Sequence, residues 1–207
     1  MDKSLQPTPI VDSDNDAIQQ KARQLTTGRE DVVEKAKVLF YFVRDEIKYN
    51  PYLPKYLPEH FQASQTLARG EGYCVQKAVL LVALARALGI PARLGFAKIR
   101  NNLLTEKIRA WMNGDIFPWH GFAELYIEGK WVKATAAFDL KMCRENGLLP
   151  VEFDGRSDAQ FPAHNQDGKP FVEYLLYRGQ YDDVPLDEIR KTLLELFGTL
   201  DVPPPPR

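Results

Sequence analysis

Cys74 has the side chain and the setting for nucleophilic chemistry. It follows the glycine-flanked turn at Gly70–Gly72 and Tyr73, and it opens an apolar run with helical periodicity from Val75 to Leu88. A thiol at the start of a helix meets free backbone N–H groups and the positive end of the helix dipole, and both favour its thiolate form. The sequence therefore predicts a reactive thiol at this position.

His120 supplies a base that could serve this thiol. It begins a stretch that runs to Ile127, in which successive side chains would alternate between the two faces of a β-strand. A lone cysteine or a lone histidine in such a setting is more often structural. Together they predict a cysteine nucleophile whose proton is taken up by an imidazole.

A third residue that orients the imidazole is expected from the strand that follows. Glu128-Gly129 is typical of a two-residue turn, and it predicts a hairpin with the segment Lys130–Phe138. In that register Thr135 and Asp139 lie diagonally beside His120 on its own face, with Cα atoms roughly 7–8 Å away. Asp139 is the preferred candidate, because a carboxylate can hold the imidazole tautomer and stabilise its charged form. Thr135 is the alternative and could only form a hydrogen bond.

Helices are expected to precede these strands and to position the thiol. Ser13 or Asp14 begins a helix that ends at Gly28, and a second helix carries apolar residues from Val32 to Ile47. The helix that Cys74 opens is apolar almost all round, so it should be the buried central helix. Helices followed by strands predict an α+β fold with an antiparallel sheet.

The rest of the chain gives weaker signals. Ala92–Ile99 predicts a strand, and Thr105–Met112 predicts a short helix or a flap. The segment Val151–Arg178 is polar and reads as irregular, whereas Leu186–Phe197 predicts an amphipathic helix. Pro203–Pro206 predicts a short polyproline end.

Composition excludes several classes of function. The chain has 207 residues and a net charge of −1, with 27 basic and 28 acidic residues, which argues against a nucleic-acid or membrane-surface partner. Its two cysteines do not make a disulfide framework, and no cysteine or histidine pair has the short spacing of a zinc site. No metal or cofactor is expected. The N-terminus lacks the pattern of a signal peptide, so we expect a soluble cytoplasmic protein.

The sequence resembles the transglutaminase-like superfamily, in its bacterial type, whose core resembles papain-type cysteine proteases. The resemblance covers roughly residues 30–140. In the predicted strand that begins at His120, an aromatic residue follows two positions after the histidine and Glu124 follows four positions after it, as is usual in the family. The order of the motifs makes it specific. The motifs are Gly72-Tyr73-Cys74 with Leu84–Arg93 after it, His120–Tyr126, Gly129–Val132, and the preceding helix Val32–Tyr49.

The resemblance implies an enzyme with a papain-like, transglutaminase-type core. It implies acyl transfer, or hydrolysis of an amide or peptide bond, through a Cys74 thioester, with His120 as general base and acid. A protein, a peptide or a small amide would be the substrate. The Cys74 backbone N–H would serve as oxyanion donor, and Tyr73, Trp111 and Trp119 could line the substrate cleft.

One departure from the family pattern leaves a second hypothesis open. The family usually has an aspartate four positions after the return-strand tryptophan, and this chain has Thr135 there. A catalytically inactive binding or scaffold domain is therefore the alternative to an enzyme. In either case we expect an N-terminal helical segment at 1–29, a core at 30–141, and a C-terminal extension at 142–207 packed on the core.

Overall fold

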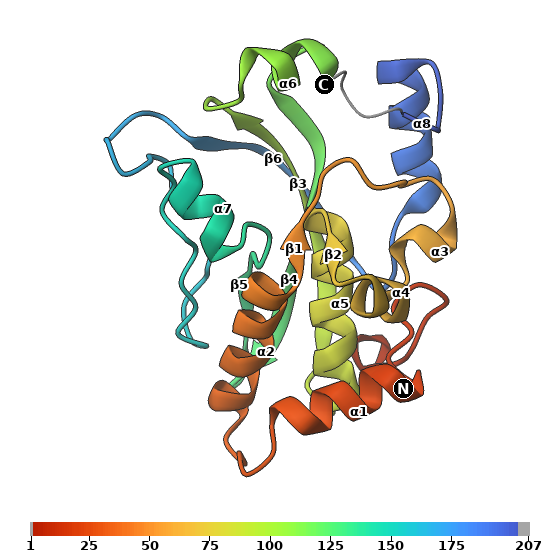
Figure 1. Cartoon of the computed structure of the whole chain (residues 1–207). Coiled ribbons are helices and arrows are strands. Elements are labelled where there is room, and N and C mark those ends of the chain that lie inside the picture. The colour runs from red at the N-terminus through yellow and green to blue at the C-terminus, as the bar shows by residue number, and fades with distance from the viewer. Residues whose placement is uncertain (1, 203–207) are drawn as a thin grey trace.

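Helices fill the first part of the chain, and a four-stranded antiparallel sheet forms most of the second (Figure 1). The structure is a computed structural model and describes residues 2–202. The predicted α+β class is confirmed. The elements are η1 (Lys3–Leu5), α1 (Asp16–Leu25), α2 (Val32–Glu46), β1 (Lys48–Tyr49), α3 (Pro58–Phe61), α4 (Ala63–Arg69), β2 (Glu71–Gly72), α5 (Cys74–Ala87), β3 (Ala92–Asn101), α6 (Glu106–Trp111), β4 (Ile116–Ile127), β5 (Lys130–Ala134), α7 (Leu140–Glu145), β6 (Val172–Tyr181) and α8 (Leu186–Phe197).

α5 is the buried centre of the molecule. Its residues from Cys74 to Arg86 are all buried, which confirms the prediction from its apolar sequence. Helices α1, α2 and α4 contact one side of α5, and strands β3 and β4 contact it from the sheet. The burial of α5 holds its first residue at a fixed point between the helical layer and the sheet.

The first two helices begin at side-chain caps. Asn15 caps α1 by accepting a hydrogen bond from the Ala17 N–H, so the cap lies just after the predicted Ser13 or Asp14. Asp31 caps α2 in the same way. After α2 the chain forms β1, which pairs in parallel with β2. This pairing sets the end of α2 beside the turn that leads into α5.

The sheet has the strand order β5-β4-β3-β6, and every neighbouring pair is antiparallel. Most of β6 falls within the segment Val151–Arg178, so the prediction that this whole segment is irregular is wrong. β6 is an edge strand with irregular register against β3, and large side chains such as Leu176 and Tyr177 are exposed. Its sequence therefore lacks the clean alternation by which a half-buried strand is recognised.

The hairpin of β4 and β5 has the predicted register. Ile127 pairs with Lys130, and both turn residues, Glu128 and Gly129, have positive φ angles of 48° and 86°. The pairing nevertheless ends at Ala134, so the predicted strand to Phe138 is wrong. On its other edge the end of β5 is bonded to a later segment: the Thr135 N–H donates to the Ala159 carbonyl, and the Ala159 N–H donates to the Lys133 carbonyl.

Close packing between β4 and α5 depends on a glycine. A Cβ atom added to Gly121 would lie 2.9 Å from the Cα atom of Val75, closer than such atoms approach in folded proteins. The missing side chain therefore lets β4 pass directly against the first turn of α5. As a result, the backbone next to His120 meets the backbone next to Cys74.

The later elements surround the start of α5. α6 begins at its cap, Thr105, and α8 spans the predicted residues Leu186–Phe197. Both lie at the end of the molecule where α5 begins (Figure 1). The predicted segment Pro203–Pro206 lies outside the described residues, and the division of the chain at residues 29 and 141 stays a prediction. Within residues 2–202 no helix combines the length and apolar character that a membrane crossing requires.

Candidate active site

Cys74 and His120 line the same small cavity at the junction of α5 and β4. Its volume is about 20 Å³, enough for one water molecule. The structure therefore brings the predicted nucleophile and the predicted base together. The other lining residues are Tyr49, Ile99, Asn101, Phe117, Phe138, Phe161 and Val172.

Burial dominates the ionisation of Cys74. It raises the pKa of the thiol above its ordinary value, because a thiolate loses solvation there. The Gly121 N–H, the Lys55 charge and the N–H groups at the start of α5 act in the opposite direction but are outweighed. The helix start does favour the anion, as predicted, but the side chain is only 8% exposed.

His120 is more deeply buried than Cys74. Its side chain lies among aromatic rings, with ring centroids at 5.0 Å for Phe161, 6.1 Å for Tyr174 and 6.2 Å for Phe122. Burial lowers the pKa of the imidazole to about 3, so the ring is neutral near pH 7. Its Nε2 atom has no hydrogen-bond partner within the described residues. A neutral ring can accept a proton, and the resting pair is a thiol and an imidazole without charge.

The Asp139 carboxylate accepts hydrogen bonds from backbone groups, not from His120 as predicted. Its Oδ1 atom accepts a hydrogen bond from the Met142 N–H at 2.8 Å and caps α7, and its Oδ2 atom accepts one from the Tyr49 N–H at 3.0 Å. No hydrogen bond joins Asp139 to His120 in the described part of the chain. The reason is the early end of β5, which turns the chain into α7 before Asp139 could pair across from β4.

Thr135 takes the position that the family usually fills with aspartate. It is 1% exposed, and its hydroxyl oxygen has no hydrogen-bond partner. In residues 2–202, this atom and His120 Nε2 are the two buried side-chain polar atoms without a partner. Tyr174 packs beside His120, and burial raises the pKa of this phenol to about 12. The Thr135 hydroxyl lies near enough to lower that pKa in part, but no hydrogen bond of ordinary geometry joins the two groups.

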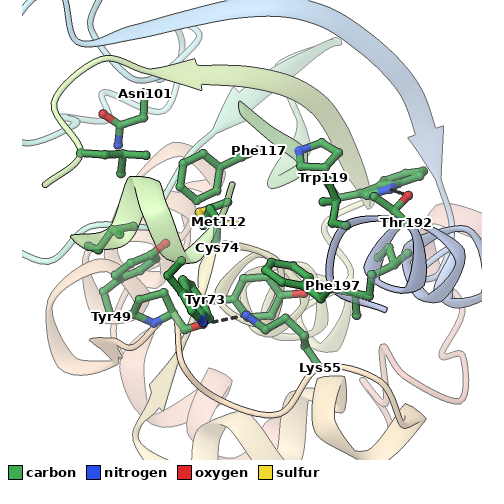
Figure 2. A pocket seen from close by; sticks show the side chains of 18 of the residues that line it. Tyr49, Lys55, Tyr73, Cys74, Asn101, Met112, Phe117, Trp119, Thr192 and Phe197 are labelled. Carbon is green, nitrogen blue, oxygen red and sulfur yellow. Dashed lines mark hydrogen bonds between the residues drawn. The ribbon is translucent and has the colours of Figure 1, made fainter. Parts of the chain in front are cut away.

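A larger apolar pocket adjoins Cys74 and has a volume of about 160 Å³ (Figure 2). Its walls come from α6, α8, β4 and the loop before α3. All three residues predicted for a substrate cleft, Tyr73, Trp111 and Trp119, line it. The remaining residues of the lining are Tyr49, Pro51, Lys55, Asn101, Leu104, Ile108, Met112, Phe117, Pro118, Phe138, Met142, Ile189, Thr192, Leu193, Leu196 and Phe197.

The indole of Trp119 is held in place at the pocket wall. Its N–H donates a hydrogen bond to the Thr192 hydroxyl of α8 at 2.9 Å, and the Arg178 guanidinium lies 4.3 Å from its ring centroid. Trp119 therefore anchors α8 to the sheet. The Cys74 N–H, the predicted oxyanion donor, is one of the groups that face the sulfur.

Lys55 is a site residue that the sequence analysis missed. Lys55 is half-buried in the pocket lining (Figure 2), and burial lowers the pKa of its ammonium group to about 8. The Nζ atom donates a hydrogen bond to the Pro51 carbonyl at 2.7 Å. It also lies 5.1 Å from the Tyr73 ring centroid and 5.7 Å from that of Trp111. The available signal was a single lysine within an aromatic, proline-rich loop.

Gln76 holds this loop over the start of α5. Its Oε1 atom accepts a hydrogen bond from the Tyr73 N–H at 3.0 Å, and its Nε2 atom donates to the carbonyls of His60 at 2.7 Å and Pro54 at 3.2 Å. A polar side chain in the first turn of a largely apolar helix was the signal for it. Gln76 therefore fixes Lys55 and Cys74 relative to each other.

Other polar residues have structural positions. Glu124 forms an ion pair with Arg93 at 2.7 Å on the face of the sheet. Cys143 is 1% exposed, lines neither cavity, and has its pKa raised to about 11 by burial. Among the described residues no group of three His, Cys, Asp or Glu side chains could hold a metal ion.

Residues 19–136, more than half of the chain, match the family model of the transglutaminase-like superfamily. The chain belongs to this superfamily. Cys74, His120 and Thr135 all fall within the matched segment of the transglutaminase-like core. No relative was found among the curated protein sequences.

One solved structure shares the fold of this transglutaminase-like chain. A candidate cysteine protease from Cytophaga hutchinsonii superposes with a TM-score of 0.50 at 19% identity, over 86% of this chain and 53% of that one. The chain therefore spans about half the length of that protein. Two further similar structures are a candidate protease from Parabacteroides distasonis (TM-score 0.41, 16% identity, 62% of this chain and 26% of that one) and a TGase (TM-score 0.39, 14% identity, 61% and 31%).

Proposed function

We propose that this protein is a thiol-dependent enzyme that transfers or hydrolyses an acyl group through a Cys74 thioester. The observation that supports this most is the cavity shared by Cys74 and His120 within a transglutaminase-like fold. The substrate would be a protein, a peptide or a small amide, and the cytoplasm stays the expected location.

The uncharged state of the resting pair defines the first step. As the Cys74 sulfur attacks the carbonyl carbon, the thiol proton passes to the neutral His120 imidazole, and the carbonyl electrons move to its oxygen. The Cys74 N–H faces this region and can donate to the oxyanion. The imidazolium then returns the proton to the leaving amine, and a thioester remains. Water or another amine resolves the thioester, with His120 taking up and returning one proton again.

We further propose that the reaction uses a Cys-His dyad supported by Thr135. The carboxylate of Asp139 is engaged by two backbone N–H groups, whereas the Thr135 hydroxyl and His120 Nε2 are both buried without a partner. Asp139 would then act on the site only indirectly, through its hydrogen bond to the Tyr49 backbone. Without a carboxylate, the imidazolium is stabilised mainly by the negative charge that develops on the substrate.

An inactive binding or scaffold domain is the second candidate. The raised pKa of the Cys74 thiol and the low pKa of the His120 imidazole both favour it, because neither group is charged or pre-activated at rest. It predicts that ligands occupy the pocket beside Cys74 without turnover.

Hydrolysis of a panel of N-acyl p-nitroanilides and peptide amides would separate the two candidates. We expect release of p-nitroaniline or ammonia by the wild type, and no release by Cys74→Ala. The matched control is Cys143→Ala, which removes the other thiol and should retain the activity. Turnover that persists in Cys74→Ala would contradict the proposal. A wild type that binds these compounds but neither turns them over nor forms an acyl adduct would support the inactive domain.

A further inference from the structure

The pocket beside Cys74 has the size and the surface of a site for one aromatic or branched apolar group. Its volume of about 160 Å³ is close to that of an engineered cavity of about 150 Å³ that binds benzene. The rings of Trp111, Phe117 and Phe197 and the aliphatic side chains of α8 form its walls. A flat ring of six carbon atoms would therefore fill it.

The charge of this pocket comes from one residue. Among its described lining residues Lys55 is the single charged side chain, and no aspartate, glutamate, arginine or histidine lines the pocket. Within residues 2–202 no ion pair joins Lys55 to a carboxylate. Its Nζ atom has one carbonyl acceptor and two ring faces around it, although an ammonium group has three donors.

A buried cation of this kind favours a negatively charged ligand. Charges interact more strongly in a pocket of low dielectric constant than in water. An anion is therefore attracted to the Lys55 charge, and a second cation is repelled by it. The charge also reaches the reacting atom, since Lys55 favours the thiolate of Cys74. The anionic group of a ligand held at Lys55 would therefore lie near the carbon that the sulfur attacks.

We propose that this pocket selects acyl donors that carry a phenyl-sized apolar group and a carboxylate, with the carboxylate held by the Lys55 ammonium group. This selectivity rests on the proposed function of Cys74 and specifies its substrate class. It also excludes cationic amines, such as a lysine side chain or a polyamine, from this pocket.

Four alkylating reagents test the proposal without a known substrate: 2-bromo-3-phenylpropanoate, its amide, bromoacetate and bromoacetamide. Each forms a thioether at Cys74 and releases bromide, and intact mass with peptide mapping gives the rate. Rates are measured at pH 7.5, where Lys55 is charged, and are divided by those of N-acetylcysteine. We expect the carboxylate-to-amide ratio to exceed that of the free thiol by about tenfold. We also expect the two phenyl reagents to have higher relative rates than bromoacetate and bromoacetamide.

Variants of Lys55 identify the source of the preference. Lys55→Met should lower the carboxylate-to-amide ratio to that of the free thiol, and Lys55→Arg should retain it. The control is Lys107→Met, which removes an exposed charge from α6 without altering the pocket lining. In the wild type the ratio should also fall as the pH passes about 8, the pKa of Lys55. If Lys55→Met does not fold, Lys55→Arg and this pH dependence still decide the question.

The outcomes separate this inference from the proposed function. A ratio that is unchanged in Lys55→Met, or a wild-type ratio equal to that of the free thiol, would overturn the carboxylate site. Equal rates for phenyl and small reagents, relative to the free thiol, would overturn the apolar part. Failure of Cys74 to react with any reagent in the folded protein would instead overturn its role as a nucleophile.

Discussion

Acid should destabilise this protein through His120. Burial lowers the pKa of this imidazole to about 3, whereas a histidine in an unfolded chain has a pKa of about 6.5. Between these two values the unfolded chain binds a proton that the folded protein does not bind. The free energy of unfolding therefore falls as the pH falls through this window, and it is independent of His120 above it.

The size of the effect follows from the two pKa values. One proton contributes about 1.4 kcal/mol per pH unit inside the window. On lowering the pH from 7 to 5 the protein should lose about 2 kcal/mol through His120, and from 7 to 4 about 3 kcal/mol. The side chain is 1% exposed, so solvent screening does not reduce these values greatly.

Urea unfolding of the wild type and of His120→Phe at pH 7, 5.5 and 4 would measure this effect. Phenylalanine suits the site because Phe161 and Phe122 already surround the imidazole ring. The other titrating groups are common to both proteins, so their contributions cancel in the difference. We expect the difference in unfolding free energy to shift in favour of the variant by about 3 kcal/mol between pH 7 and 4. A difference that stays constant with pH would refute a buried neutral His120.

Three further substitutions test other parts of the site. The pKa of Lys77 is lowered by burial to about 7, so the wild type should gain about 2 kcal/mol relative to Lys77→Met between pH 7 and 9, as measured by urea unfolding. Gly121→Ala places a Cβ atom 2.9 Å from the Val75 Cα atom, and it should lower stability by about 1–3 kcal/mol and slow acylation of Cys74. Thr135→Val should change stability by less than about 1 kcal/mol, because its hydroxyl has no partner, but should lower kcat if that hydroxyl orients His120.

Each of these predictions has an outcome that contradicts it. Parallel stability curves for the wild type and Lys77→Met would mean that the Lys77 amine is not protonated differently in the folded and unfolded states. Full stability and full acylation in Gly121→Ala would mean that the close contact of β4 with α5 is not required. An unchanged kcat in Thr135→Val would mean that the Thr135 hydroxyl does not orient His120.

Local sequence signals predicted the elements that carry the site. The turn residues Glu128 and Gly129 determine the register of the hairpin through their own backbone angles, so the pairing of β4 with β5 could be derived from the sequence. The helix after Cys74 is a long and almost wholly apolar run, and Leu186–Phe197 has the periodicity of an amphipathic helix, so both were predicted. These features depend on neighbours in the chain.

Features that depend on distant segments could not be predicted in the same way. The strand β5 ends at Ala134, where it also pairs with the distant segment around Ala159, and Asp139 instead caps α7. The pKa of Cys74 depends on how deeply the folded chain buries its sulfur, which the helix start alone does not reveal. Lys55 reaches the pocket because the loop before α3 lies against it, and this placement depends on the folded chain.

Acylation of Cys74 by p-nitrophenyl phenylacetate tests the central claim most directly. The account predicts a rapid release of one equivalent of p-nitrophenol, together with a phenylacetyl adduct on Cys74 that peptide mapping locates. The adduct should be absent in Cys74→Ala and should form more slowly in His120→Phe. An adduct on another residue, or a Cys74 that stays unmodified until the protein is unfolded, would contradict the account.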